Sequence, residues 1–200
     1  MDPESLAELP LAPGQHSLWF MNDLVATRAA YHVVELHRLR GCLYADDLRR
    51  AMGALIDRHE ALRTCFRVRD GVPYQVVQTA AGIAWEQADV SAARNPEAAA
   101  LEVVAARSAE PFNLATGPLF RITLVRLGPL EHFFALTAHQ IIADKRSMEI
   151  LFTELSHLYN AFRDGRPAKL TALPAQYSDF ALFQQELLQD ARADQISYQA

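Results

Sequence analysis

The sequence predicts an α/β fold with a mixed β-sheet flanked by helices. Segments rich in β-branched and aromatic residues alternate with segments whose apolar residues recur at helical spacing. Two turn signals, Asp70-Gly71 and Gly128-Pro129, separate strand-like segments and indicate hairpins. At 200 residues, half of them apolar, the chain can form one sizeable core, so a single compact unit is expected.

The first half of the chain is expected to begin with a short helix over residues 15–25, followed by a strand within residues 29–41. The clearest helix comes next, because Asp46 and Asp47 suit the positive end of a helix dipole. Its apolar face is expected to carry Leu48, Met52, Leu55 and Ile56.

The second half contains a segment that is almost wholly apolar, residues 132–138, as expected for a strand covered on both faces. An alanine-rich surface helix is expected before it, beginning near Asn95-Pro96. The apolar strand would be central and would deliver His139 and Gln140 to its carboxyl end. An amphipathic helix follows, for which Ser147 is a reasonable N-cap, and another begins after Pro174.

Composition excludes several classes of function. The chain has 19 basic and 24 acidic residues and no basic run, so we expect no nucleic-acid partner. It has no apolar stretch of the roughly 18 to 20 residues that cross a bilayer, and its N-terminus has no basic flank, so we expect no membrane partner and a cytoplasmic protein. Cys42 and Cys65 lack ligand spacing, and no metal site is expected.

The strand-to-helix turn holds the candidate chemistry. An imidazole such as His139 can accept a proton near neutral pH, whereas the amide of Gln140 cannot. A lone histidine at a strand end is more often structural, but the carboxyl edge of a sheet is where ligands commonly bind. Asp144 could orient an imidazole, bind a cation or pair with an arginine; we favour the arginine, with Arg58 or Arg63 as its partner.

These residues also resemble a known family. Five segments occur in the order and spacing of the condensation domains of nonribosomal peptide synthetases: LAPGQHSLWFMNDL, RHEALRTCF, EPFNLATGPLFRITL, EHFFALTAHQIIADKRSMEIL and LPAQYSDFALFQQELL. These domains belong to the chloramphenicol-acetyltransferase-like superfamily. The resemblance runs from about Leu9 to the last residue and implies that residues 1–200 are the N-terminal lobe of a condensation domain, with the C-terminal lobe absent from this chain.

The resemblance implies a reaction in which an acceptor amine attacks a donor thioester and an amide forms. Both groups are held on the phosphopantetheine arms of peptidyl or acyl carrier proteins, and no cofactor is bound directly. The active site of the family lies at the floor of a tunnel between two lobes. The implied partners are carrier proteins, the missing lobe and neighbouring synthetase modules. Some relatives with degenerate motifs recruit a tailoring enzyme, so such an enzyme is a further possible partner.

The central motif of the family is H-H-x-x-x-D-G, in which the second histidine positions or deprotonates the amine and the aspartate is structural. Aligned without a gap, the chain has His139, Gln140 and Asp144 at these three positions, and Lys145 at the glycine. The residue that should act on the amine is therefore an amide. The remaining residues expected at the tunnel floor are Arg146, Ser147, Gln15 and Trp19, while Arg58 or Arg63 would hold Asp144.

Three functions remain open at this point. The first is a catalytically impaired condensation lobe that binds carrier-tethered substrates or serves as an interface module. The second is an active amide-forming condensation domain that tolerates Gln140 by positioning a self-sufficient amine. The third is a standalone acyltransferase that uses a soluble thioester such as coenzyme A. Gln140, Lys145 and Arg146 favour the first, and whether the chain is an enzyme is left undecided.

Overall fold

A computed structural model describes residues 7–24, 28–80 and 82–198. The elements are β1 (Glu8–Pro10), α1 (Pro13–Leu24), η1 (Arg28–Tyr31), β2 (His32–Arg40), α2 (Ala45–Arg58), η2 (Glu60–Arg63), β3 (Thr64–Arg69), β4 (Val72–Val77), β5 (Trp85–Asp89), α3 (Pro96–Ser108), β6 (Phe120–Gly128), β7 (Glu131–His139), α4 (Lys145–Arg163) and α5 (Tyr177–Tyr198). The helices and both hairpins expected from the sequence are present. The strands β1 and β5 are not predicted from the sequence.

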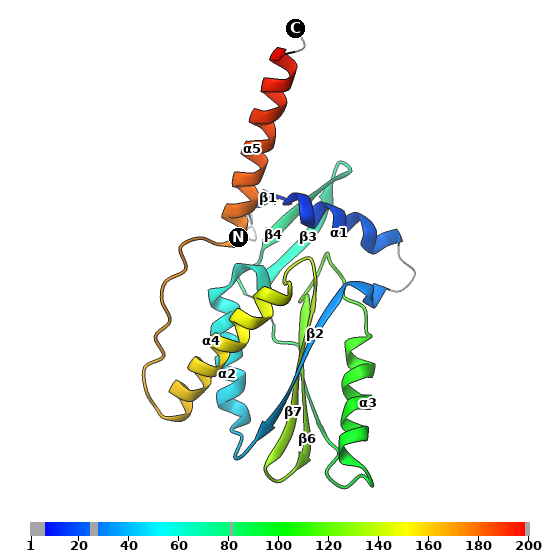
Figure 1. Ribbon diagram of the computed structural model, residues 1–200, viewed down its shortest axis with the longest axis vertical. Helices are drawn as coiled ribbons and strands as arrows, with labels where there is room; N and C mark the ends of the chain where they lie inside the picture. Colours follow the sequence, from blue (N-terminus) through cyan, green and yellow to red (C-terminus); the bar gives the residue numbers. More distant parts are fainter. Residues whose placement is uncertain (1–6, 25–27, 81, 199–200) are drawn as a thin grey trace, which may run out of the picture.

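The strands form two sheets. The larger has the order β2-β7-β6-β5 and is mixed, because β5 runs parallel to β6 while the other neighbours are antiparallel. The smaller has the order β1-β4-β3 and is antiparallel throughout. Figure 1 shows α2 and α4 on one face of the larger sheet and α3 on the other. The predicted α/β class is therefore confirmed, with β7 as an interior strand.

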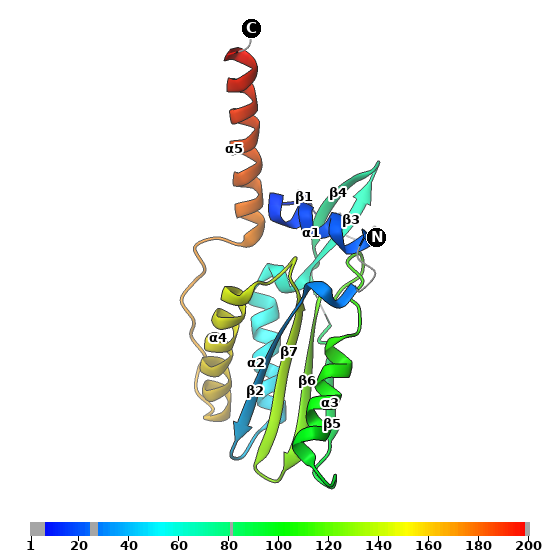
Figure 2. The same ribbon diagram turned by 45° about the vertical axis from the view of Figure 1, so that its right-hand side comes forward.

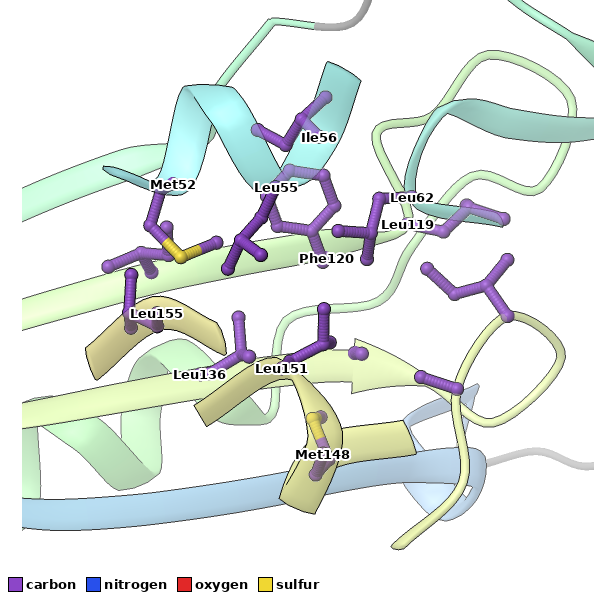
Figure 3. Packing of buried hydrophobic residues seen from close by; sticks show 14 of the residues in the cluster. Met52, Leu55, Ile56, Leu62, Leu119, Phe120, Leu136, Met148, Leu151 and Leu155 are labelled. Atoms are coloured by element: carbon purple, nitrogen blue, oxygen red, sulfur yellow. The ribbon is translucent and has the colours of Figure 1, made fainter. Parts of the chain in front are cut away.

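The main core lies between the larger sheet and the pair α2 and α4. Leu55 of α2, Leu151 of α4 and Leu136 of β7 are each 5% exposed or less and converge there, as Figure 3 shows. Apolar residues at helical spacing on the two helices thus meet a strand that is apolar on both faces. Burial of one such side chain stabilises the fold by roughly 1.5 to 3 kcal/mol. This packing fixes β7 and the residues that follow it.

The hairpin between β3 and β4 explains one sequence signal directly. Arg69 pairs with Val72, so Asp70 and Gly71 form a two-residue loop. Both have positive φ, 51° and 79°, which is the backbone of a type I′ turn. Aspartate tolerates this region and glycine favours it, so the dipeptide sets the register of the smaller sheet.

The last helix, α5, extends away from the rest of the chain in both views (Figures 1 and 2). Its first turns contact β1 and η2. Ser178 and Ala181 are buried there, at 8% and 0% exposed. Other large apolar side chains of this helix are exposed, including Phe180, Phe183, Leu187 and Leu188. The helix therefore buries one side of its first turns and presents apolar surface to solvent elsewhere.

Candidate active site

The strand β7 delivers the candidate residues as the sequence predicts. His139 is its last residue, and its N–H donates to the carbonyl oxygen of Leu119 at 2.9 Å. Gln140 follows, with its N–H donating to the carbonyl oxygen of Tyr31 at 2.8 Å. Backbone bonds to both sides of β7 therefore fix the position of these two residues.

His139 is withdrawn from solvent and has 0% exposure. Its Nδ1 accepts a hydrogen bond from the N–H of Ile141 at 3.1 Å. Burial, with a smaller contribution from His32, lowers the pKa of His139 to about 4. The ring is therefore neutral at pH 7 with its proton on Nε2, and this fixed, buried imidazole cannot serve as a base for a substrate outside the core.

Gln140 lies next to it in sequence but faces solvent. Its side chain makes no hydrogen bond to the part of the chain that the structure describes. Strand β7 ends at His139 and is buried on both faces, whereas Gln140 is the first residue of the turn that follows and is therefore exposed. The amide is available to a ligand as a donor or an acceptor of hydrogen bonds, but it carries no titratable proton near neutral pH.

Asp144 caps helix α4. Its Oδ1 accepts hydrogen bonds from the N–H and the hydroxyl of Ser147, both at 2.7 Å, and the N–H of Asp144 donates to the Ser147 hydroxyl at 3.3 Å. The Ser147 bonds hold the pKa of Asp144 below its ordinary value. Ser147 is thus the N3 partner in a capping box, and its expected role as N-cap is wrong because the helix begins two residues earlier.

The expected pairing of Asp144 with an arginine is also wrong. Arg58 instead forms an ion pair with Glu154 of α4, with Nη2 and Oε1 3.1 Å apart. Arg63 donates to main-chain carbonyls, at 3.2 Å to Ile56 and 2.6 Å to Gln78. The Asp144 carboxylate is already hydrogen-bonded within the capping box. The guanidinium of Arg63 finds a carbonyl acceptor near the C-terminal end of α2 instead.

The residues after Asp144 differ in how their charges are compensated. Lys145 and Arg146 begin helix α4 and are exposed. Arg146 forms an ion pair with Glu149 at 2.7 Å, whereas Lys145 has no ion pair within the described ranges. The two cations stand in the first turn of α4, where the helix dipole disfavours positive charge. Ser147 also lines a cavity of about 230 Å³ with Ile142 and Leu151.

Gln15 belongs to this site, whereas the structure places Trp19 in a different hollow. Gln15 is 3% exposed, and its Nε2 donates to the carbonyl oxygen of Ile141 at 3.4 Å. Its Oε1 accepts from the N–H of Ala12 at 2.9 Å. Helix α1 is thereby joined to the turn that carries Gln140. Trp19 packs against the core and lines a separate hollow with Phe66 and Phe112.

Two contributors escaped the sequence reasoning. His32 is the cross-strand partner of His139, with ring centroids 6.1 Å apart, and Tyr31 supplies the acceptor for Gln140. Both sit where β2 begins. An antiparallel pairing of the predicted strand over residues 29–41 with the apolar strand would have brought them near His139, but spacing alone does not give the register.

No metal-binding cluster of three or more histidine, cysteine or acidic residues occurs among the residues that the structure describes. Within the same residues, no helix combines the length and the apolar character that a bilayer crossing requires.

Comparison with known proteins decides the family. The sequence model described as the condensation domain matches residues 5–198. The chain belongs to the condensation-domain family. Relatives include the chondramide synthase cmdD of Chondromyces crocatus, 37% identical over 89% of this chain, and the phosphinothricin tripeptide synthetase PhsC of Streptomyces viridochromogenes, 34% identical over 97%. The chain spans only 5% and 18% of these proteins. The resemblance to condensation domains of nonribosomal peptide synthetases is thus confirmed.

Solved structures give the same fold. The starter condensation domain of the rhizomide synthetase RzmA matches with a TM-score of 0.86 at 21% identity, over 96% of this chain and 47% of that one. The X-domain, in its complex with OxyB from teicoplanin biosynthesis, matches with a TM-score of 0.81 at 29% identity, over 96% of this chain and 40% of that one. The predicted fold of this superfamily is confirmed.

Proposed function

We propose that this chain is the N-terminal lobe of a condensation domain that binds thioester substrates on carrier proteins but is catalytically impaired, and that it acts as a binding or interface module of a synthetase. The observation that carries this proposal is the exposed amide of Gln140 at the end of β7. The motif of the family has an ionisable ring at this position. The neighbouring imidazole, His139, is buried and does not replace it.

The expected chemical consequence follows from the reaction of the family. An amine that attacks a thioester must lose a proton, and the imidazole of the family motif is the group that positions or deprotonates it. Gln140 can hold an amine or an oxyanion by hydrogen bonds but cannot take the proton. A positioned acid or base contributes about 10² to 10⁴ in rate. Binding should therefore survive while the rate of amide formation falls by a factor of this order.

The positive charges beside Gln140 should also lower the rate of amide formation. Lys145 stands at the position of the motif glycine, at the start of α4, and its charge is not paired within the described chain. A developing ammonium on the acceptor would be repelled by it. Arg146 contributes less, because Glu149 partly compensates its charge at 2.7 Å. An ammonium is strongly hydrated, so Lys145 would also add polar bulk where a pantetheine arm of a carrier protein should pass.

The assignment to one lobe has two supports. The chain matches only 40% and 47% of two solved relatives while nearly all of it is matched itself. Helix α5 contacts β1 and η2, yet its side chains Phe183 and Leu187 remain 55% and 52% exposed. Exposed apolar side chains that cluster on one helix are typical of a surface made to be covered. We propose the C-terminal lobe of the condensation domain as the occupant of this surface.

A role as an interface module has support in one relative. The X-domain is 29% identical to this chain, and it is bound to a separate protein, OxyB, in the solved complex. A condensation-type fold can therefore serve as a platform for a second protein. For this chain we propose carrier proteins and neighbouring synthetase modules as partners, with a tailoring enzyme as a further partner of the same kind.

The proposal can be tested in the synthetase that contains this chain. Native protein, the Gln140→His variant and the Gln140→Ala variant are compared with carrier proteins loaded with donor and acceptor. We expect all three to bind the carriers, and amide formation to rise by about 10² or more only with histidine. Equal rates of amide formation for native protein and the histidine variant would contradict the proposal that native protein is catalytically impaired. Absence of carrier binding by native protein would exclude the binding role.

An active, glutamine-dependent condensation domain is the second candidate. The free hydrogen-bonding groups of Gln140 favour it, because they could orient a neutral amine without taking its proton. The Gln140→Ala variant separates the two. An active enzyme of this kind would lose most of its rate on this substitution, whereas an impaired module would change little.

A further inference from the structure

His32 and His139 face each other across the β2–β7 pair. They are direct partners in the antiparallel register, so both rings lie on the same face of the sheet. The ring centroids are 6.1 Å apart, with the planes inclined at 68°. This is the face that α3 covers, because His32 contacts Ser108, the last residue of that helix.

The protonation pattern of His32 follows from its contact with α3. Its Nδ1 lies 2.7 Å from the carbonyl oxygen of Ser108. A carbonyl only accepts, so Nδ1 carries the hydrogen. Burial, and more weakly the guanidinium of Arg121, lower the pKa of His32 and keep the ring neutral. The lone pair is therefore on Nε2, which is buried and has no partner among the described residues.

His139 has the complementary pattern. Its Nδ1 accepts from the N–H of Ile141, so the hydrogen of the neutral ring is on Nε2. This atom is also buried without a partner in the described part of the chain. One ring thus has an unpaired donor, and its cross-strand neighbour has an unpaired acceptor. Buried polar groups in native proteins are nearly always paired, directly or through an ordered water.

We propose that His32 and His139 act as one hydrogen-bonded pair, with Nε2–H of His139 as donor and Nε2 of His32 as acceptor, and that His32 is a positioning residue for the Gln140 turn. Two imidazoles joined directly by a bond of about 3 Å would have centroids about 5 Å apart. At 6.1 Å, one bridging water or a small rotation of one ring completes the pair.

The pair acts on the site through the main chain. With Nε2 of His139 held, Nδ1 stays directed at the N–H of Ile141. The preceding peptide is held by Tyr31, whose carbonyl oxygen accepts from the N–H of Gln140 at 2.8 Å. Tyr31 and His139 therefore bind the peptide groups on both sides of Gln140, and His32 would act by holding the ring of His139. The effect of the His32–His139 pair on catalysis or binding rests on the proposed function, whereas the existence of the pair does not.

Two substitutions of His32 separate its two nitrogens. In His32→Asn the side-chain amide N–H replaces Nδ1–H and keeps the bond to Ser108, but nothing replaces Nε2. In His32→Gln the amide oxygen reaches the place of Nε2 and can still accept. His37→Asn is the matched control, since it lies on the same strand with its ring against Phe152 of α4, on the other face of the sheet.

The test is nitrogen NMR of the protein labelled with ¹⁵N-histidine, each signal being assigned by substitution. We expect Nδ1–H for His32 and Nε2–H for His139 at pH 7. The Nε2 signal of His139 should shift in His32→Asn and stay near its native position in His32→Gln and His37→Asn. Hydrogen on Nδ1 of His139, or a His139 signal that does not respond to His32→Asn, would overturn the pair.

Hydrogen exchange tests the positioning role. Exchange of the Ile141 and Gln140 amides should become roughly tenfold faster or more in His32→Asn, with little change in His32→Gln. Circular dichroism confirms that each variant is folded. Unchanged exchange in folded His32→Asn would exclude positioning by His32. Neither measurement depends on amide formation, so the pair and the proposed function can fail separately.

Discussion

Arg58 and Glu154 form an ion pair between α2 and α4, with side chains only 19% and 14% exposed. The same guanidinium donates to the carbonyl oxygen of Thr171 at 2.6 Å, and His59 Nε2 lies 2.7 Å from the carboxylate. Burial raises the pKa of Glu154, but Arg58 and His59 outweigh it and the pKa falls below its ordinary value. This cluster joins the two helices that pack on the sheet to the segment leading to α5.

Arg58→Met should lower the free energy of unfolding by about 2 kcal/mol, because it leaves a mostly buried carboxylate with only His59 as partner. Arg40→Met is the control: its side chain is 76% exposed and 3.4 Å from Glu131, so a change below about 0.5 kcal/mol is expected. Denaturant unfolding measures both. Equal effects of the two substitutions would contradict a special role for the Arg58–Glu154 pair.

Asp144→Ala should cost about 1 kcal/mol of stability, because α4 loses its N-cap and its capping box. Asparagine also caps helices, so Asp144→Asn should recover most of this loss. The two variants are compared by thermal unfolding. A loss in Asp144→Asn as large as in Asp144→Ala would instead indicate that the negative charge itself is needed, as in a pair with an arginine.

Sequence reasoning located the helices, both hairpins and the strand that carries the candidate site, because periodicity and turn residues are local signals. The apolar segment over residues 132–138 and the Asp70-Gly71 dipeptide are sufficient for these assignments. The family followed from five collinear segments. The central claim at Gln140 needed only the gapless motif, and the structure adds that the residue is exposed.

Partners of charged side chains were not predictable in the same way. Asp144 was assigned to an arginine, yet a serine three residues later satisfies it. Arg58 forms an ion pair with Glu154, which lies 96 positions away in the sequence. Such contacts depend on how α2 and α4 pack, which sequence spacing does not encode. The His32–His139 contact escaped for a related reason, since strand register decides it.

The stability of the fold should depend on pH through His139. Its pKa in the folded chain is about 4, against 6.5 for an ordinary histidine. Between these values the unfolded chain binds a proton that the folded chain does not, so stability is full above pH 6.5 and falls as the pH drops. From pH 7 to pH 5 we expect a loss of about 2 kcal/mol, before most carboxylates are protonated.

The measurement is denaturant unfolding at several pH values between 7 and 5. His139→Asn should flatten the profile, because the amide oxygen can still accept from Ile141 but does not titrate. His37→Asn, at an exposed position, should leave the profile unchanged. The lowered pKa values of His32 and His132 add slope of the same sign, so a residual slope in His139→Asn is expected. A full native slope in that variant would contradict the assignment.

The Gln140→His variant should show a pH–rate profile that native protein lacks. An exposed imidazole at this position would titrate near its ordinary pKa of about 6.5. Amide formation should therefore rise with pH across that value, as the ring becomes a base. Adding Lys145→Gly, which restores the motif glycine, should raise the rate further by removing a nearby positive charge. A flat profile in Gln140→His would mean that the ring does not contact the reacting amine.

Substitution of Phe183 tests whether α5 is covered in the complete protein. The side chain is 55% exposed here, so Phe183→Gln should change the stability of this chain by less than about 0.5 kcal/mol. If a second lobe covers the helix, the same substitution should destabilise the complete domain by about 2 kcal/mol or more, because a buried aromatic ring would be replaced by a polar group. Gln184→Ala, one residue further along the helix, is the control. The measurement is thermal unfolding of this chain and of the complete domain. An equally small loss of stability in both would mean that the apolar side chains of α5 stay exposed and do not contact a second lobe.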